Sequence, residues 1–125
     1  MKSGLIAWLC VALTIVLTIY GQMIVKWQVL ERGRLPAGLH ARLAFFVSFF
    51  LSPWMLSVLF ATGIAAVSWV TALSRLELSR AYPFTALSFV TVLLLSAIFF
   101  DETVTLAKLA GVALIILGLV VGAGL

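Results

Sequence analysis

The sequence is short of acidic residues and has a single cysteine and a single histidine, and each shortage excludes a class of function. Four of the 125 residues are Asp or Glu, and all of them fall at expected helix ends rather than in pairs at catalytic spacing. Cys10 has no second cysteine for a disulfide within the chain, and His40 has no other ligand type beside it for a metal. We therefore expect neither an enzyme, nor a metal site, nor a cofactor.

Apolar residues dominate the chain. Hydrophobic residues make up 65% of it, charged residues make up 10%, and the mean hydropathy is +1.30, whereas soluble domains are about half apolar. A helix needs about 20 apolar residues to cross the roughly 30 Å hydrocarbon core, so the chain can supply three or four spans. The net charge of +4 comes from cations near span ends, which favours anionic lipid headgroups or an anionic substrate over nucleic acid as partners.

The apolar runs predict an all-α membrane protein with four transmembrane helices in a single membrane domain, residues 1–125. The four spans are expected at about 4–26, 54–73, 80–100 and 104–124, with both termini on one side. The first run continues past Tyr20 without a small-residue cleavage site, which indicates a retained span rather than a secretory signal. The segment "VLERGRLPAGLHAR", residues 29–42, predicts a loop. Lysine and arginine are nearly balanced between the two sides, which leaves the orientation open.

The apolar stretch from Leu43 to Leu73 is too long to cross the membrane as one upright helix. As a single helix it would extend about 46 Å at 1.5 Å per residue. Pro53, which follows Ser52, is the natural break. We therefore predict a short interfacial helix over residues 43–51, between the first two spans, with four phenylalanines clustered on one side. One long tilted helix kinked at Pro53 is the alternative.

Two polar faces run along the expected spans. The candidate substrate-binding residues on them are Thr14, Thr18, Gln22, Lys26, Tyr82, Thr85 and Ser88. The first four recur at every fourth position, so they share one face of a helix while drifting slowly around it. The next three form a second such face at the start of the third span. A helix in lipid with a polar edge is typical of a substrate path.

Ordinary helix packing is the alternative for several of these residues. Thr and Ser hydroxyls in membrane helices often bond the carbonyl one turn earlier in their own helix. Gln22 fits that alternative poorly, because its amide has four hydrogen-bonding positions that one helix cannot satisfy. Lys26 either extends its ammonium group to the membrane interface beside Trp27 or binds an anion.

Glycines mark one side of the fourth span. Gly118 and Gly122 form a G-x-x-x-G pattern, and Gly111 precedes them by two turns. Such a strip permits close approach of another helix backbone. Packing within the chain is one interpretation, but four short helices enclose too little space for a substrate path. We therefore expect a dimer interface at these glycines.

The segments "YGQMIVKW", "AYPFTALSFV" and "DETVTLAKLAGVALIILGLVVG" resemble the four-helix form of the drug/metabolite transporter superfamily. The small multidrug resistance proteins of that superfamily have a glycine and then a lysine in the first helix, matched here by Gly21 and Lys26. They also carry a membrane-embedded glutamate eight residues before that lysine, which binds both the proton and the cationic drug. Here that position is Thr18, which cannot titrate.

The closer pattern is that of the aminoarabinose-phosphoundecaprenol flippase subunits. Their first helix has Gly-Gln followed by a lysine and their third helix begins Ala-Tyr-Pro, matched here by Gly21, Gln22, Lys26, Ala81, Tyr82 and Pro83. These subunits also lack the glutamate. The resemblance covers the first, third and fourth spans, about two thirds of the chain.

This resemblance implies a transporter or flippase subunit of the bacterial inner membrane that translocates a polyprenyl-phosphate-linked sugar between leaflets. Its expected partners are membrane lipid, an anionic lipid-linked substrate such as an undecaprenyl phosphate sugar, and either a second copy or a second four-helix subunit. A cation at the end of a polar edge attracts a phosphate, whereas an acid would repel it.

Two other functions stay open. A small multidrug resistance-type exporter of hydrophobic cations or other small metabolites needs a carboxylate inside the membrane, and we expect none there. Glu102 in particular is expected to serve the N-terminus of the fourth span. The other alternative is a non-transporting scaffold subunit of a glycolipid-modifying enzyme, which nothing in the sequence excludes.

Overall fold

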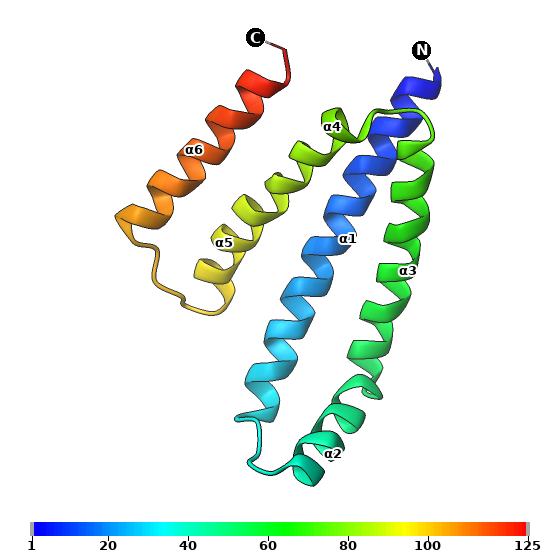
Figure 1. The fold of residues 1–125 in the computed structure, drawn as a ribbon. Helices are drawn as coiled ribbons and strands as arrows, with labels where there is room; N and C mark the ends of the chain where they lie inside the picture. Colours follow the sequence, from blue (N-terminus) through cyan, green and yellow to red (C-terminus); the bar gives the residue numbers. More distant parts are fainter. Residues whose placement is uncertain (1, 125) are drawn as a thin grey trace.

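The computed structural model describes residues 2–124, and every regular element in that range is a helix (Figure 1). In chain order the elements are α1 (Lys2–Arg32), α2 (Leu39–Phe50), α3 (Pro53–Leu73), α4 (Leu78–Ala81), the 3₁₀ helix η1 (Tyr82–Ala86), α5 (Leu87–Phe99) and α6 (Leu106–Gly122). The beginning of α1 and the end of α6 lie at the same end of the molecule (Figure 1). The all-α prediction is confirmed for these residues.

Helices α1 and α3 pack against each other as an antiparallel pair (Figure 1). Small residues are buried on both of them, Ala7 on α1 and Ala65 and Ala72 on α3. The Thr14 hydroxyl oxygen lies 3.4 Å from the Ala65 carbonyl oxygen, so a side chain of one helix reaches the backbone of the other. Small side chains permit this close approach, which is the usual way that helices associate in a membrane.

The loop between α1 and α2 is shorter than the predicted one. Helix α1 continues to Arg32 and α2 begins at Leu39, so only residues 33–38 of the segment 29–42 lie outside a helix. Glycines with positive φ bracket this loop, Gly33 at 79° and Gly38 at 93°. Only glycine adopts such angles at little cost, and a glycine of this kind commonly follows the last turn of a helix. The helix ends are therefore set by the two glycines rather than by the charges.

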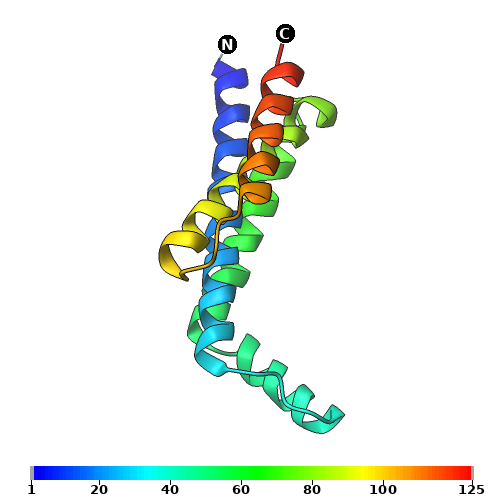
Figure 2. The same cartoon turned by 90° about the vertical axis from the view of Figure 1, so that its left-hand side faces the viewer.

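The break at Pro53 is present, as the sequence predicts. Helix α2 ends at Phe50, and α3 starts at Pro53 with Ser52 as its N-cap. The Ser52 hydroxyl accepts a hydrogen bond from the Met55 backbone N–H at 3.3 Å, and a proline in the first turn has no N–H to leave unbonded. Figure 2 shows α2 turned away from the direction of α1 and α3. The alternative of one long helix kinked at Pro53 is wrong, because residues 51–52 separate two distinct helices.

The four phenylalanines of α2 do not share one environment. Phe49 is buried against Met55 of α3, whereas Phe46 and Phe50 are exposed. Phe45 stacks on Phe49 with ring centroids 5.9 Å apart. Phe46 contacts Phe45 and Phe50 contacts Phe49, with ring centroids 5.6 and 5.4 Å apart. The four rings therefore cluster as expected, although only Phe49 is buried.

The third apolar run folds as α4, η1 and α5 in succession. Pro83 lies in the first turn of η1, where its missing N–H leaves no bond unmade. Leu78–Phe99 is long and apolar enough to cross a membrane, and so are Gly4–Arg32 and Pro53–Leu73. Three spans are thereby supported by length and composition.

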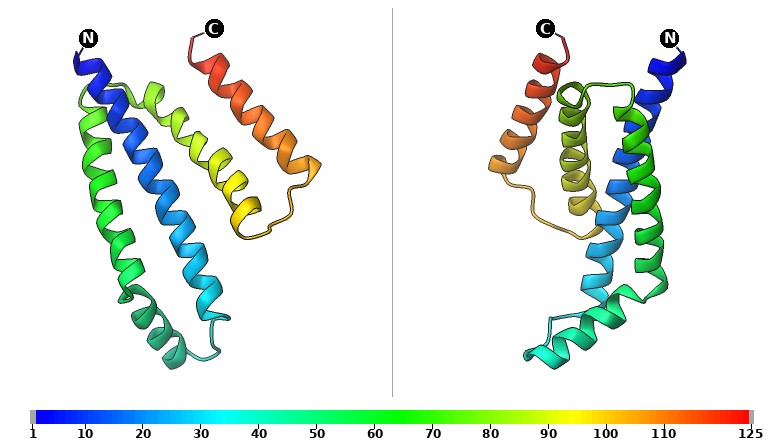
Figure 3. Two further views of the ribbon diagram at one scale, coloured as in Figure 1. Left: turned by 180° about the vertical axis from the view of Figure 1, so that it is seen from behind. Right: turned by 45° about the vertical axis from the view of Figure 1, so that its right-hand side comes forward.

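Helix α6 is shorter than the predicted fourth span at 104–124. Its 17 residues extend about 25 Å at 1.5 Å per residue, somewhat less than the roughly 30 Å core. The Thr105 hydroxyl caps it by accepting from the Lys108 backbone N–H at 3.2 Å, so the residues before Thr105 are not helical. Helix α6 contacts α5 and η1 and stands at the edge of the molecule (Figure 3).

Candidate substrate cavity

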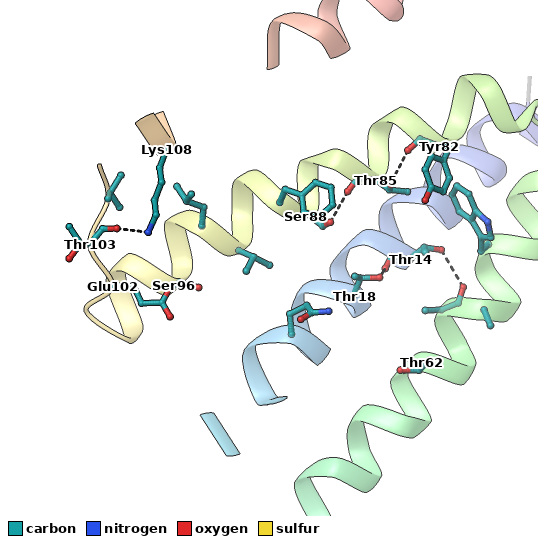
Figure 4. A pocket seen from close by; sticks show the side chains of 18 residues that line it. Thr14, Thr18, Thr62, Tyr82, Thr85, Ser88, Ser96, Glu102, Thr103 and Lys108 are labelled. Carbon is teal, nitrogen blue, oxygen red and sulfur yellow. Dashed lines mark hydrogen bonds between the residues drawn. The ribbon is translucent and has the colours of Figure 1, made fainter. Parts of the chain in front are cut away.

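A cavity of about 730 Å³ is lined by residues of α1, α3, η1, α5, the loop before α6 and the start of α6 (Figure 4). Its volume is within the usual range of ligand pockets, roughly 300–1,000 Å³. The polar residues of its wall are Thr14, Thr18, Gln22, Thr62, Tyr82, Thr85, Ser88, Ser96, Glu102, Thr103 and Lys108. Apolar side chains such as Trp69, Phe89 and Val92 complete it. A wall of this mixed character suits a ligand with both a polar and an apolar part.

Six of the seven candidate substrate-binding residues line this one cavity. They are Thr14, Thr18, Gln22, Tyr82, Thr85 and Ser88. The polar face of α1 and the polar face of η1 and α5 therefore meet across the same space (Figure 4). Their role in binding stays a prediction, but the expectation that the two faces act together has a structural basis.

Five hydroxyl groups of the wall donate to a carbonyl one turn earlier in the chain, those of Thr14, Thr18, Thr62, Thr85 and Ser88. Thr18 bonds the Thr14 carbonyl at 2.8 Å, and Ser88 bonds the Thr85 carbonyl at 2.6 Å. Thr85 bonds the Tyr82 carbonyl at 2.6 Å in the same way. The ordinary packing geometry of Thr and Ser is thus confirmed at these positions. Each hydroxyl oxygen keeps a lone pair, so these groups can accept hydrogen bonds from a ligand that carries donors.

Lys26, the seventh candidate, is not among the lining residues. Its ammonium nitrogen lies 3.5 Å from a carboxylate oxygen of Glu102, and 43% and 42% of the two side chains are exposed. Among the side chains of residues 4–124 this is the one ion pair. Trp27 beside it packs edge-to-face on Trp54, with ring centroids 5.0 Å apart. Lys26 therefore contacts a residue of the cavity wall, Glu102, without lining the cavity itself.

Glu102 is the main correction to the sequence analysis. It does not serve the N-terminus of the fourth helix, because α6 begins at Leu106 with Thr105 as its cap. The loop of residues 100–105 instead carries the carboxylate to the cavity, where it meets Lys26. The sequence indicated only a span end for this acid and did not place it at the cavity. No spacing rule relates residues 26 and 102, so only the fold brings the two charges together.

Lys108 is the functional candidate that sequence reasoning missed. It lies in the first turn of α6 and lines the cavity. Its ammonium nitrogen donates to the Thr103 carbonyl oxygen at 2.7 Å (Figure 4). The available signal was a lysine placed between a short polar turn and an apolar run, and such a residue usually marks only a span end.

The three glycines of α6 are open on the side that a Cβ would occupy. A Cβ built at Gly111, Gly118 or Gly122 has no described atom within 4 Å beyond its own helix backbone. Close packing against another described helix of this chain is thus not found at these positions. They remain available to a neighbouring helix from outside the chain.

Comparison with known proteins gives one family and a consistent set of relatives. The profile of the EamA-like transporter family matches residues 3–122. The probable 4-amino-4-deoxy-L-arabinose-phosphoundecaprenol flippase subunit ArnE of Pseudomonas aeruginosa (strain UCBPP-PA14) is 40% identical over 109 residues, which cover 86% of this chain and 88% of the relative. The protein of the same name from Aeromonas salmonicida (strain A449) is 33% identical over 117 residues, 94% of this chain and 96% of the relative.

A relative of the companion type also matches. The probable flippase subunit ArnF of Photorhabdus laumondii subsp. laumondii, named for the same lipid-linked sugar, is 33% identical over 118 residues, 85% of this chain and 87% of the relative. No solved structure was found to match. Because the family profile and these relatives each extend over most of the chain, the chain belongs to the EamA-like transporter family, within the drug/metabolite transporter superfamily.

Proposed function

We propose that this chain is a subunit of a flippase that moves a sugar linked to a polyprenyl phosphate between the leaflets of the bacterial inner membrane. The observation that carries the proposal is the single cavity on which the polar faces of α1 and α5 converge. The relatives ArnE and ArnF are named as subunits of a flippase for 4-amino-4-deoxy-L-arabinose-phosphoundecaprenol, which agrees with it. The chain is a multi-pass membrane protein, as its family and its long apolar helices require.

The wall of the cavity is suited to a sugar headgroup. A sugar is rich in hydroxyl donors, and an amino sugar adds an ammonium group. The hydroxyl oxygens of Thr18, Thr85 and Ser88 can accept such hydrogen bonds, since their own hydrogens are already donated to carbonyls. The Gln22 amide both donates and accepts. The phosphate would then bind at the cationic end of the cavity. The polyprenyl chain would lie in the surrounding lipid.

A proton-coupled cation exporter is less well supported by this geometry. The carboxylate that such a mechanism uses would stand at Thr18, which is a hydroxyl bonded to its own helix. Glu102 does line the cavity, but it is paired with Lys26 at 3.5 Å. A non-transporting scaffold needs no polar cavity of about 730 Å³. The relatives are named as transport subunits rather than enzymes, and we propose a transport function here too.

An amine-labelling assay tests the proposed function. Inner-membrane vesicles that contain the chain and its candidate partner subunit are loaded with an amino sugar on undecaprenyl phosphate, and the outer leaflet is probed with a membrane-impermeant amine reagent. We expect labelled lipid to appear much faster than in vesicles that lack the chain. Equal rates in the two preparations, at matched partner levels, would contradict a flippase role.

We also propose that α6 is a fourth span within a single membrane domain over residues 1–125. Helix α6 has no charged residue after Lys108, and a shorter apolar helix is accommodated by local thinning of the bilayer. Four spans agree with the position of the start of α1 and the end of α6 at one end of the molecule. The partner, whether a second copy or a second four-helix subunit, would then pack on the glycine side of α6.

Leucine at Gly118 or Gly122 should weaken that association. A bulky side chain would hold the two helices apart, and the expected loss is about 1–2 kcal/mol, roughly tenfold in the dimer dissociation constant. Analytical ultracentrifugation in detergent measures it. The matched control is Gly63→Leu on α3, where an added Cβ also meets open space. If the Gly118→Leu and Gly63→Leu proteins associate equally, the interface lies on another face.

Helix α2 is proposed to lie along the membrane surface, in line with its direction in Figure 2. Arg32 supports this placement, because its guanidinium bonds the Ser48 hydroxyl at 3.0 Å and lies 5.6 Å from the centre of the Phe49 ring. An arginine at the end of a membrane-spanning helix usually lies at headgroup level. Because Arg32 contacts α2, we expect α2 to lie at that level too.

Cysteine scanning along α2 tests this placement. In a protein with Cys10 replaced by serine, single cysteines at successive positions from Leu39 to Phe50 should react with a membrane-impermeant thiol reagent in a pattern of period about 3.6 residues. Cysteine at Phe49 should be among the least reactive, because that side chain is 5% exposed. Uniform protection along the whole helix would show that α2 is not at the surface.

A further inference from the structure

Glu102 and Lys108 line the charged end of the cavity, and Lys26 stands beside it, paired with Glu102. The two lysines are not equivalent. Lys26 on α1 is paired with the Glu102 carboxylate at 3.5 Å. Lys108 on α6 lines the cavity itself, and its ammonium nitrogen contacts a neutral carbonyl, that of Thr103, at 2.7 Å. The net charge of +1 at this end is therefore carried by Lys108.

We propose that Lys108 is the anion ligand of the cavity and holds the phosphate of the lipid-linked substrate. This assignment rests on the proposed function, and it names the residue that receives the charged part of the substrate. It differs from the sequence expectation, in which Lys26 alone played that role. Lys26 instead pairs with Glu102 and offsets the negative charge that this carboxylate brings to the cavity wall.

The position of Lys108 is fixed on both sides. Its backbone N–H donates to the Thr105 hydroxyl at 3.2 Å, which anchors the first turn of α6. An ammonium group has three hydrogens, so Lys108 can keep its bond to Thr103 and direct the others at a phosphate oxygen. The first turn of a helix also favours a nearby negative charge.

The Glu102 carboxylate is the one negatively charged group among the residues that line the cavity. It occupies Lys26 and lines the same cavity as Lys108. A phosphate at Lys108 therefore binds against the repulsion of Glu102, and neutralising Glu102 should strengthen binding. If the Lys26–Glu102 pair were purely structural, breaking it should instead leave the affinity for phosphate unchanged or lower it.

Lipid binding to the purified protein in detergent tests the assignment, with native mass spectrometry as the readout. The probes are undecaprenyl phosphate, undecaprenol as the neutral lipid, and inorganic phosphate as a competitor. We expect Lys108→Gln and Lys108→Met to lower the affinity for undecaprenyl phosphate about tenfold and to leave undecaprenol unaffected. Glu102→Gln should raise the affinity for the phosphate lipid. If inorganic phosphate displaces the lipid, the site recognises the phosphate group alone. If inorganic phosphate does not compete, the lipid chain also contributes to binding.

Arg42→Gln is the matched control. Arg42 is a cation that also donates to a loop carbonyl, that of Pro36 at 3.0 Å, but it does not line the cavity. Its replacement should leave the affinity for undecaprenyl phosphate unchanged. An equal loss in the Arg42 and Lys108 variants would mean that net charge alone attracts the lipid, and it would overturn the assignment.

A measurement on the unaltered protein keeps the test independent of how the variants fold. Acylation of lysines by an amine-reactive ester is followed residue by residue with and without lipid. Undecaprenyl phosphate should slow acylation of Lys108 more than that of Lys26, and undecaprenol should slow neither. Equal protection of the two lysines would overturn the assignment to Lys108. If the protein does not distinguish undecaprenyl phosphate from undecaprenol at all, the proposed anionic substrate fails as well.

Discussion

Glutamate in place of Thr18 should reduce transport of the lipid-linked sugar phosphate about tenfold. Thr18 lies in the wall of the cavity, eight residues and so about 12 Å along the helix axis from Lys26. A carboxylate in the same cavity repels the bound phosphate, and a rise of about 1.4 kcal/mol in the binding free energy corresponds to the tenfold loss.

The control for this variant is Thr18→Gln, which has the same shape without the charge. The glutamine variant should transport substantially better than the glutamate variant in the amine-labelling assay at matched expression. The glutamate variant should also gain weak binding of a hydrophobic cation such as tetraphenylphosphonium, because it restores the acid that the small multidrug resistance proteins carry at this position. Equal transport by the two variants would show that size, not charge, matters at residue 18.

Alanine in place of Lys26 should also lower transport about tenfold, with little change in the unfolding temperature. The Lys26–Glu102 pair is more than 40% exposed on both sides, and such pairs contribute less than about 1 kcal/mol to stability. Its loss nevertheless leaves the Glu102 carboxylate without a neutralising partner at the cavity wall. The net charge of Lys26, Glu102 and Lys108 then falls from +1 to zero, which weakens the attraction for a phosphate.

A double replacement separates charge from anchoring. The protein with Lys26→Ala and Glu102→Gln together regains the net charge of +1 from Lys108, and we expect it to recover much of the transport lost in Lys26→Ala alone. Lys26→Arg should keep part of the activity, although a guanidinium and an ammonium group differ in geometry. If Lys26→Ala transports as well as the unaltered protein, Lys26 is only an interfacial anchor beside Trp27.

The features that the sequence predicted correctly depend on local rules. Helical periodicity puts Thr14, Thr18 and Gln22 on one face of α1, and all three line the cavity. The break before α3 follows from the chemistry of Ser52 and Pro53, since a hydroxyl cap and a proline without an N–H act on their own first turn. No knowledge of the rest of the fold is needed for either.

The features that the sequence did not predict depend on contacts between distant segments. Glu102 and Lys108 line the cavity. The loop before α6 places Glu102 beside Lys26 of α1, and its Thr103 carbonyl accepts a hydrogen bond from Lys108. Phe49 is buried because α2 folds back on Met55 of α3, which composition alone does not reveal. In both cases the residue type indicated only a position near the membrane boundary. Its contacts depend on the tertiary arrangement.

The hydroxyl groups that bond back to their own helices also bear on how the substrate leaves. A transporter must release what it binds, and a polar group that loses its hydrogen-bond partner in a dry environment costs several kcal/mol. Thr18 and Ser88 lose no donor bond when the sugar departs, because their hydrogens stay on the carbonyls of Thr14 and Thr85. These two positions can therefore face acyl chains with little penalty. At this part of the wall the departure of the sugar leaves no unpaired donor, which favours release of the substrate.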